Sequence, residues 1–220
     1  MITHPSMKIL AIETATSACS VALHIAGECI HRLEIEPRAH TRILLPMINS
    51  VLKEAGVTLD QMDVLAYGCG PGSFTGVRIA SAVIQGLGFG VGHSKSMRMG
   101  QQGHSKPIPI IPVSSLRALA QQLFQKTKNP NVCAMLDARM QEMYWGLFKA
   151  NAEGLMEAVG KEQLTSKQNI ILSEIAGDWL IEEGYPTAVE VAALASFDYL
   201  NGQAVEVRDA LPVYLRNQVV

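Results

Sequence analysis

The residues with the clearest potential for chemistry form a glycine-rich segment, residues 68–78, with the sequence GCGPGSFTGVR. It separates an apolar run, residues 64–67, from a long series of small and apolar residues that begins at Thr75. A glycine-rich turn between a strand and a helix can bring backbone N–H groups close to a phosphate or to another backbone segment. The first question is whether this turn binds a ligand or shapes a surface.

The spacing within the turn disagrees with the common ligand-binding and catalytic turns. A P-loop requires Lys and Ser or Thr after its last glycine, whereas Gly76 precedes Val and Arg. A dinucleotide-binding turn requires a third glycine where this chain has Thr75. A serine hydrolase places its nucleophile midway between two glycines, and Ser73 is displaced by one position. We therefore expect a tight elbow, with Ser73 or Thr75 capping the helix that follows. The elbow comprises Gly70, Gly72, Ser73, Thr75, Gly76 and Arg78.

Two acidic residues, Glu13 and Asp137, occupy similar positions in a weak internal repeat. Each ends an apolar strand and precedes a short polar turn and a return strand. Two such carboxylates facing one cleft could bind Mg²⁺ or position a water molecule beside a nucleotide. The alternative is that each accepts hydrogen bonds from backbone at its strand end, and the residue pattern leaves both open. The candidate nucleotide cleft comprises Glu13, Thr14, Thr16, Ser17, Asp137 and Arg139.

Composition limits the remaining classes of protein. The 220 residues are 48% apolar and 17% charged, which favours a packed globular protein of one large or two small domains. A net charge of −2 provides no general attraction to nucleic acid or to anionic membranes. The histidines and cysteines lack zinc-site spacing, so we expect no metal site in this chain. Without a signal-peptide pattern or a run of about 18 apolar residues, the expected location is the cytoplasm.

Periodicity predicts two lobes of mixed α/β structure. Apolar and alternating patterns predict an antiparallel meander of three strands, then a helix, a buried strand and a helix that begins at the elbow and ends near residue 86. These elements occupy residues 8–14, 20–25, 29–35, 41–55, 64–68 and 75–86. Thr41 is expected to cap the first helix and Gly56 to end it.

A basic, glycine-containing segment, residues 90–106, follows and predicts a loop at a lobe boundary. It could contact RNA phosphates or could be a solvated loop. We accordingly divide the chain into residues 1–106 and 107–220. The second lobe is expected to contain three strands, a helix capped by Ser114 or Ser115, and a later helix that begins at Thr187. The strands occupy residues 108–113, 132–137 and 143–148, and the helices end near residues 124 and 200.

The helix over residues 41–55 and the helix after the elbow carry more apolar surface than one sheet can cover. Small residues in the second helix would allow another helix to approach closely. We expect these two helices to pack against helices of a partner. The candidate interface comprises Leu44, Met47, Ile48, Val51, Val77, Ala80, Val83, Ile84 and Leu87.

Six motifs distributed over the whole chain resemble the TsaB (YeaZ) family of the glycoprotease-like superfamily. The first three are KILAIETAT at residues 8–16, HTRILLP at residues 40–46, and GPGSFTGVR at residues 70–78. The others are PVSSL at residues 112–116, LDAR at residues 136–139, and PVYLR at residues 212–216.

The resemblance implies an actin-like (ASKHA) α/β fold of two RNase H-like lobes, each a mixed sheet with flanking helices, with the C-terminus returning to the first lobe. It implies a role in threonylcarbamoyladenosine (t6A) modification of the tRNA anticodon loop. In this family the chain is a non-catalytic subunit that dimerises with and activates the transferase TsaD. The ATPase TsaE joins them, tRNA is bound through the complex, and the chain alone forms a homodimer. ATP and a metal then belong to the partner subunits.

The resemblance also supplies a test of the non-catalytic role. TsaD relatives carry an H-x-x-x-H metal motif just after the strand that matches residues 108–113, and the matching positions here are Ser115 and Leu119. Neither side chain is a good ligand for iron or zinc. Relative to the family, about fifteen residues near 93–107 are extra and the region 163–187 is short. An ATP-hydrolysing enzyme that uses the cleft is the alternative, and a peptidase lacks an identifiable nucleophile, base and orienting residue.

Overall fold

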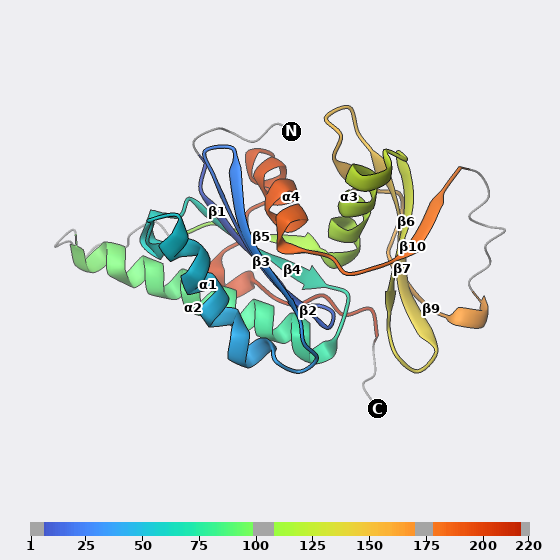
Figure 1. Ribbon diagram of the computed structural model, residues 1–220, viewed down its shortest axis with the longest axis horizontal. Helices are drawn as coiled ribbons and strands as arrows, with labels where there is room; N and C mark the ends of the chain where they lie inside the picture. Colours follow the sequence, from blue (N-terminus) through green and yellow to red (C-terminus); the bar gives the residue numbers. More distant parts are fainter. Residues whose placement is uncertain (1–6, 99–107, 170–177, 217–220) are drawn as a thin grey trace.

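The computed structural model describes residues 7–98, 108–169 and 178–216 of the chain. These residues form two five-stranded sheets with helices between and outside them (Figure 1). Helices α3 (Ser115–Thr127) and α4 (Ala188–Leu200) lie between the two sheets and contact each other.

The first sheet has the strand order β3-β2-β1-β4-β5. Strands β1 (Ile9–Glu13), β2 (Ala18–Ile25) and β3 (Glu28–Ile35) form the expected antiparallel meander. Strand β4 (Val64–Gly70) runs parallel to β1, and β5 (Ile110–Ser114) runs parallel to β4 at the sheet edge. Thus β5 belongs to the first sheet, although sequence analysis assigned it to the second lobe.

The two faces of this sheet follow the period of two expected for a strand. In β1, Leu10 and Ile12 face a core formed with α1 (His40–Glu54) and α2 (Phe74–Arg98). Ile9, in the same strand, faces the opposite core, which α4 covers. Because both faces are covered, the five residues of β1 are all buried.

The second sheet has the strand order β10-β6-β7-β8, with β9 also paired to β7. Helix α3 packs on it through a separate apolar core. Its strands are β6 (Asn131–Asp137), β7 (Glu142–Ala150), β8 (Met156–Ala158), β9 (Gln163–Ser166) and β10 (Leu180–Glu183). Three short 3-10 helices complete the described chain: η1 (Leu59–Gln61), η2 (Lys167–Asn169) and η3 (Val207–Asp209).

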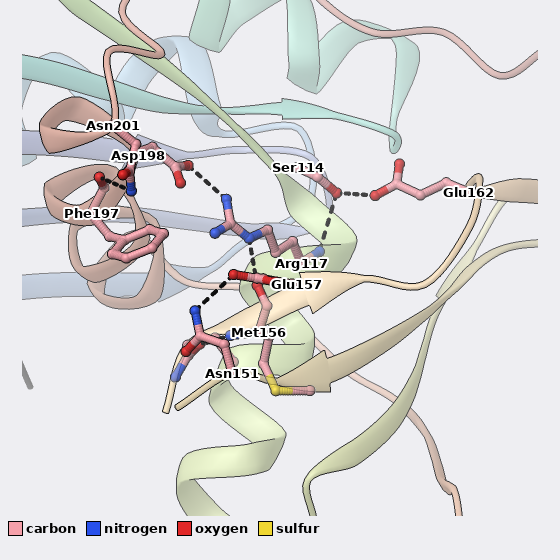
Figure 2. Close-up of polar contacts among 10 residues, drawn as sticks. Ser114, Arg117, Asn151, Met156, Glu157, Glu162, Phe197, Asp198 and Asn201 are labelled. Atoms are coloured by element: carbon pink, nitrogen blue, oxygen red, sulfur yellow. Dashed lines mark hydrogen bonds and ion pairs between the residues drawn. The ribbon is translucent and has the colours of Figure 1, made fainter. Parts of the chain in front are cut away.

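Arg117 links α4, which covers the first sheet, to β8 of the second sheet (Figure 2). Its Nη1 donates to Asp198 Oδ2 in α4 at 2.6 Å, and its Nε donates to the Met156 carbonyl in the second sheet at 2.7 Å. The side chains of Arg117 and Asp198 are 15% and 2% exposed. Ser114, which caps α3 through the Arg117 N–H, also donates to Glu162. A buried ion pair of this kind is costly to break from one side, so the lobes are held in one arrangement.

Of the helix caps predicted from the sequence, the one for α3 is observed and the one for α1 is not. Ser114 caps α3 through its side chain, as predicted, and the Thr187 side chain caps α4, which was predicted only to begin there. Thr41 does not cap α1: the N-cap is Ala39, and no side chain there bonds to the helix. Thr41 already lies inside the helix, where its side chain cannot accept from the following N–H groups.

Helix α2 is longer than predicted. It continues through the alternating glycines to Arg98, so the glycines do not end it and much of the predicted loop is helical; residues 99–107 lie outside the described part. Contrary to expectation, its window Phe74–Val91 is apolar and long enough to cross a membrane by length and composition alone. This is weak evidence, because core helices of soluble proteins meet the same criterion, and α2 packs on β4 here.

The C-terminal segment returns to the first lobe and then reaches the second. Tyr67 Oη donates to the Leu211 carbonyl at 3.0 Å, and the Val213 N–H donates to the Cys69 carbonyl at 2.7 Å. Arg216 then donates to the Ala138 carbonyl in the second lobe at 3.1 Å. We call residues 207–216 the tail, because the segment joins α2, β4 and the β6–β7 turn.

Candidate functional site

The elbow between β4 and α2 is packed against the turn that follows β1. A Cβ atom at Gly76 would overlap the Thr14 carbonyl, and one at Gly72 would overlap Ala15. Gly70 adopts a φ of +108°, which an L side chain rarely tolerates, and lies against the Val213 carbonyl of the tail. The glycines are thus required for close approach between backbone segments.

Three backbone N–H groups of the elbow, those of Ser73, Gly76 and Val77, donate within the chain. The Ser73 N–H donates to the Ala15 carbonyl at 2.6 Å, and the Val77 N–H donates to the Ser73 carbonyl at 3.0 Å. The Gly76 N–H donates to Ser73 Oγ at 3.4 Å, which agrees with the predicted capping role of this serine. A phosphate cradle needs free N–H groups that converge on the anion, and the engagement of these three groups favours packing as the role of the elbow.

A cavity of about 1010 Å³ lies between the lobes, bounded by the elbow, the start of α1 and the β6–β7 turn. Four of the predicted cleft residues line it: Thr16, Ser17, Asp137 and Arg139. Glu13 and Thr14 do not line it; they are buried beneath the elbow, where Thr14 Oγ1 donates to the Gly76 carbonyl at 2.8 Å. The structure therefore divides the predicted cleft into exposed and sealed parts.

Glu13 is sealed by its neighbours and is 0% exposed. Its Oε1 accepts from the Ala15 N–H at 2.6 Å, and its Oε2 is hydrogen-bonded to Ser115 Oγ at 2.8 Å. A Cβ atom at Gly68 would overlap the carboxylate, which fills the space above this glycine. Burial raises the pKa of Glu13 to about 7, although these hydrogen bonds oppose the shift. This side chain supports the junction of β1, β4 and α3.

Asp137 lies at the rim of the cavity and keeps 35% of its side chain exposed. Its carboxylate lies 3.5 Å from Arg139 Nη1 and 3.6 Å from Lys167 Nζ, and its Oδ1 accepts from the Arg139 N–H at 3.2 Å. After Ala138, the three residues Arg139, Met140 and Gln141 all adopt left-handed φ values of 53–64°. This conformation is costly for residues with a Cβ, and Arg216 of the tail is bonded to Ala138 and Glu142 on either side of the turn.

The structure places most of the predicted interface side chains inside the chain, where they are not accessible to a partner in this arrangement. Seven of the nine side chains are buried, six of them in the chain's own first core, and Val83 and Leu87 are packed against that core. The buried residues are Leu44, Met47, Ile48, Val51, Val77, Ala80 and Ile84. The apolar spacing marked the sheet-facing side of each helix, and a helix cannot present one side both to its own sheet and to a partner.

A different side of α2 is exposed. Thr75, Arg78, Ala82, Gly86 and Phe89 follow one another at intervals of three or four residues, and all are exposed. We call these residues the α2 stripe. Phe89 is 60% exposed, and space beside Gly86 is open. The sequence signal that could have indicated this surface is the presence of two phenylalanines, Phe74 and Phe89, in a helix otherwise rich in small residues.

The two positions that correspond to the metal motif of TsaD relatives lie inside the protein. Ser115 is buried against Glu13, and Leu119 is buried in the core between α3 and the second sheet. Over residues 7–98, 108–169 and 178–216, no group of three or more His, Cys, Asp or Glu side chains could hold a metal ion.

Comparisons with known proteins agree with this architecture. A model of the TsaD family, described as tRNA N6-adenosine threonylcarbamoyltransferase, matches residues 34–96 and 101–208. The tRNA threonylcarbamoyladenosine biosynthesis protein TsaB of Escherichia coli K12 is 35% identical, over 97% of this chain and 96% of that protein. The Haemophilus influenzae TsaB protein is 34% identical, over 97% and 95%. The chain belongs to the TsaB family.

The similarity extends to solved structures of this family. The structure of YeaZ from Pseudomonas aeruginosa superposes with a TM-score of 0.83 at 36% sequence identity, covering 95% of this chain and 100% of that one. The predicted fold, an actin-like α/β arrangement of two lobes, is therefore confirmed. Within the TsaB family, the sealed elbow and the exposed α2 stripe are the features of this chain that bear on its role.

Proposed function

We propose that the chain is the non-catalytic scaffold subunit required for t6A modification of the tRNA anticodon loop. It acts by dimerising with TsaD and activating it, in a complex that TsaE joins and through which tRNA is bound. The chain alone forms a homodimer, works in the cytoplasm and requires no cofactor of its own; ATP and the metal belong to its partners. The names of the similar proteins, which refer to biosynthesis of tRNA threonylcarbamoyladenosine, support this proposal.

The exposed α2 stripe is the observation that carries the scaffold role. A long apolar helix usually buries most of its surface, yet only 39% of the window Phe74–Val91 is buried within the chain. Small residues in the middle of the stripe, Ala82 and Gly86, leave room for another helix, and Phe89 provides a large side chain to bury. Exposed aromatic residues contribute strongly to protein interfaces.

The chemistry of the described residues favours the non-catalytic part of the proposal. Glu13 is enclosed by backbone and by Ser115, so its carboxylate has no path to a ligand in the cavity. The elbow N–H group of Ser73 is bonded to Ala15. A reacting phosphate would therefore meet neither the buried acid nor a free N–H group at Ser73 in this arrangement.

Replacing Phe89 with Asp tests the scaffold role. Burying an unpaired carboxylate in the interface should reduce affinity for TsaD of the same organism by at least about 100-fold. Co-purification and calorimetric titration measure the effect, and analysis of modified nucleosides after depletion and rescue measures t6A. Val159→Asp, which introduces the same charge at another exposed apolar side chain, near the second sheet, is the matched control. Unchanged binding by F89D, or full t6A rescue by it, would contradict the proposal.

Nucleotide binding in the cleft is the second candidate function, and the cavity of about 1010 Å³ with Asp137 at its rim favours it. It predicts micromolar binding of Mg-ATP by the isolated chain. Calorimetry with Mg-ATP decides this directly, and Asp137→Asn should weaken any heat observed. Absence of heat at protein concentrations near 100 micromolar removes this candidate, because that is about 100-fold above the expected dissociation constant.

A further inference from the structure

An aromatic clamp around Arg78 lies at the start of the α2 stripe, where the tail crosses α2. The guanidinium carbon is 3.6 Å from the centre of the Phe74 ring and 5.5 Å from that of Tyr214. Arg78 Nε donates to Tyr214 Oη at 2.7 Å. Stacking and the hydrogen bond fix a side chain that is otherwise flexible, so little rotamer entropy remains to be lost when it binds a partner.

The clamp borders a groove of about 380 Å³ between α2 and the tail. Its lining residues are Arg78, Ser81, Ala82, Gln85, Leu211, Pro212 and Tyr214. Ser81 donates to the Ala210 carbonyl, and Gln85 Nε2 donates to the same atom at 3.3 Å. The tail, which forms one wall of the groove, is thus hydrogen-bonded to α2, so the groove is already formed in the free chain.

The charge of the groove is positive and uncompensated. Arg78 is the one charged residue that lines it in the described chain, and its Nη nitrogens bond to no acceptor among the described residues. Two nearby acids, Asp209 in the tail and Glu206 just before it, are paired with Arg208 instead. A guanidinium with its terminal nitrogens free can bind one carboxylate bidentately.

We propose that this groove receives an acidic side chain of the TsaD partner, whose carboxylate binds the Nη nitrogens of Arg78 while its neighbours pack on Leu211 and Pro212. The inference rests on the proposed partnership and adds the site that orients the two subunits. The apolar wall and the single cation favour a protein segment over tRNA, because protein surfaces that bind nucleic acid present several Lys or Arg side chains along a stripe.

Calorimetric titration with TsaD of the same organism tests the groove with three variants. Arg78→Ala should weaken binding by about 10- to 100-fold, since a preorganised arginine at an interface is a typical energetic hot spot. Arg78→Lys keeps the charge but loses the planar fork and should recover part of the affinity. Tyr214→Phe removes only the hydroxyl that orients Arg78, and should cost about 2- to 5-fold. Thermal unfolding of each variant confirms that it folds, and Y214F carries the test if R78A does not fold.

The salt dependence and a tRNA titration separate the possible outcomes. Raising NaCl from 50 to 300 mM should weaken the wild type more than R78A, because the variant lacks the ion pair. If R78A and Y214F bind TsaD like the wild type while F89D does not, the partnership stands and the groove proposal is wrong. If R78A binds tRNA more weakly but binds TsaD like the wild type, the ligand of Arg78 is a phosphate and the proposal is overturned. If the wild type does not bind TsaD, both proposals fail.

Discussion

Glu13 and Asp137 end strands in similar sequence patterns, yet the fold gives them opposite environments. Glu13 is fully buried and bonded to Ser115 of α3, whereas Asp137 lies at the rim of the interlobe cavity and pairs with Arg139 and Lys167. The difference arises from what covers each turn. The glycine elbow packs on the turn after β1, while the turn after β6 is held from the side by Arg216. Equivalent sequence positions are therefore no evidence for equivalent chemistry.

The comparison is tested most severely at Gly68. In Gly68→Ala the new Cβ atom would overlap the Glu13 carboxylate, in a region where backbone surrounds both residues. We expect a loss of at least about 3 kcal/mol in the free energy of unfolding, as for strong overpacking of a core. Chemical denaturation measures it.

A second substitution identifies the cause of that loss. Combining Gly68→Ala with Glu13→Ala removes the overlapping atoms, so the double variant should be markedly more stable than the sum of the two single effects predicts. Simple additivity would show that Gly68 is required for a reason other than the buried carboxylate.

The buried acid should also make stability depend on pH. The pKa of Glu13 is about 7 in the folded chain and near the ordinary glutamate value of 4.5 when the chain is unfolded. Between these values the unfolded chain loses the proton and the folded chain keeps it, so rising pH favours unfolding. Relative to Glu13→Gln, the wild type should lose about 3 kcal/mol between pH 4.5 and 7.5.

Urea denaturation at several pH values checks this dependence. Burial also raises the pKa of Glu162 and Glu190, but both remain in the variant, so the difference between the two proteins isolates Glu13. Parallel pH curves for wild type and E13Q would mean that Glu13 is not the buried, neutral acid described here.

The smallest effect is expected at the exposed acid. Asp137→Asn keeps an oxygen for the Arg139 N–H and loses two partly exposed ion pairs. Such pairs contribute about 0–1 kcal/mol each, so the free energy of unfolding should change by less than about 1 kcal/mol at any pH. A loss comparable to that of Gly68→Ala would place Asp137 in the structural class of Glu13.

Local patterns were sufficient to predict most of the elements. The meander, the Ser114 cap and the elbow followed from alternation, side-chain acceptors and glycine content, which act over a few residues. The end of α2 was misplaced because glycines were taken as a stop, while packing of the helix on β4 outweighs their low propensity. The lobe boundary was drawn by composition, which does not reveal that β5 pairs with β4.

The sequence by itself determined the family, the strand and helix pattern, and the absence of a catalytic spacing in the elbow, because motifs and periods are properties of neighbouring residues. Tertiary structure decided which acid is buried, which side of α2 is exposed and which side chains Arg78 and Arg117 contact. Arg78 meets Tyr214 across 136 positions and Arg117 meets Asp198 across 81. Contacts at such separations depend on how the lobes pack, which no local pattern encodes.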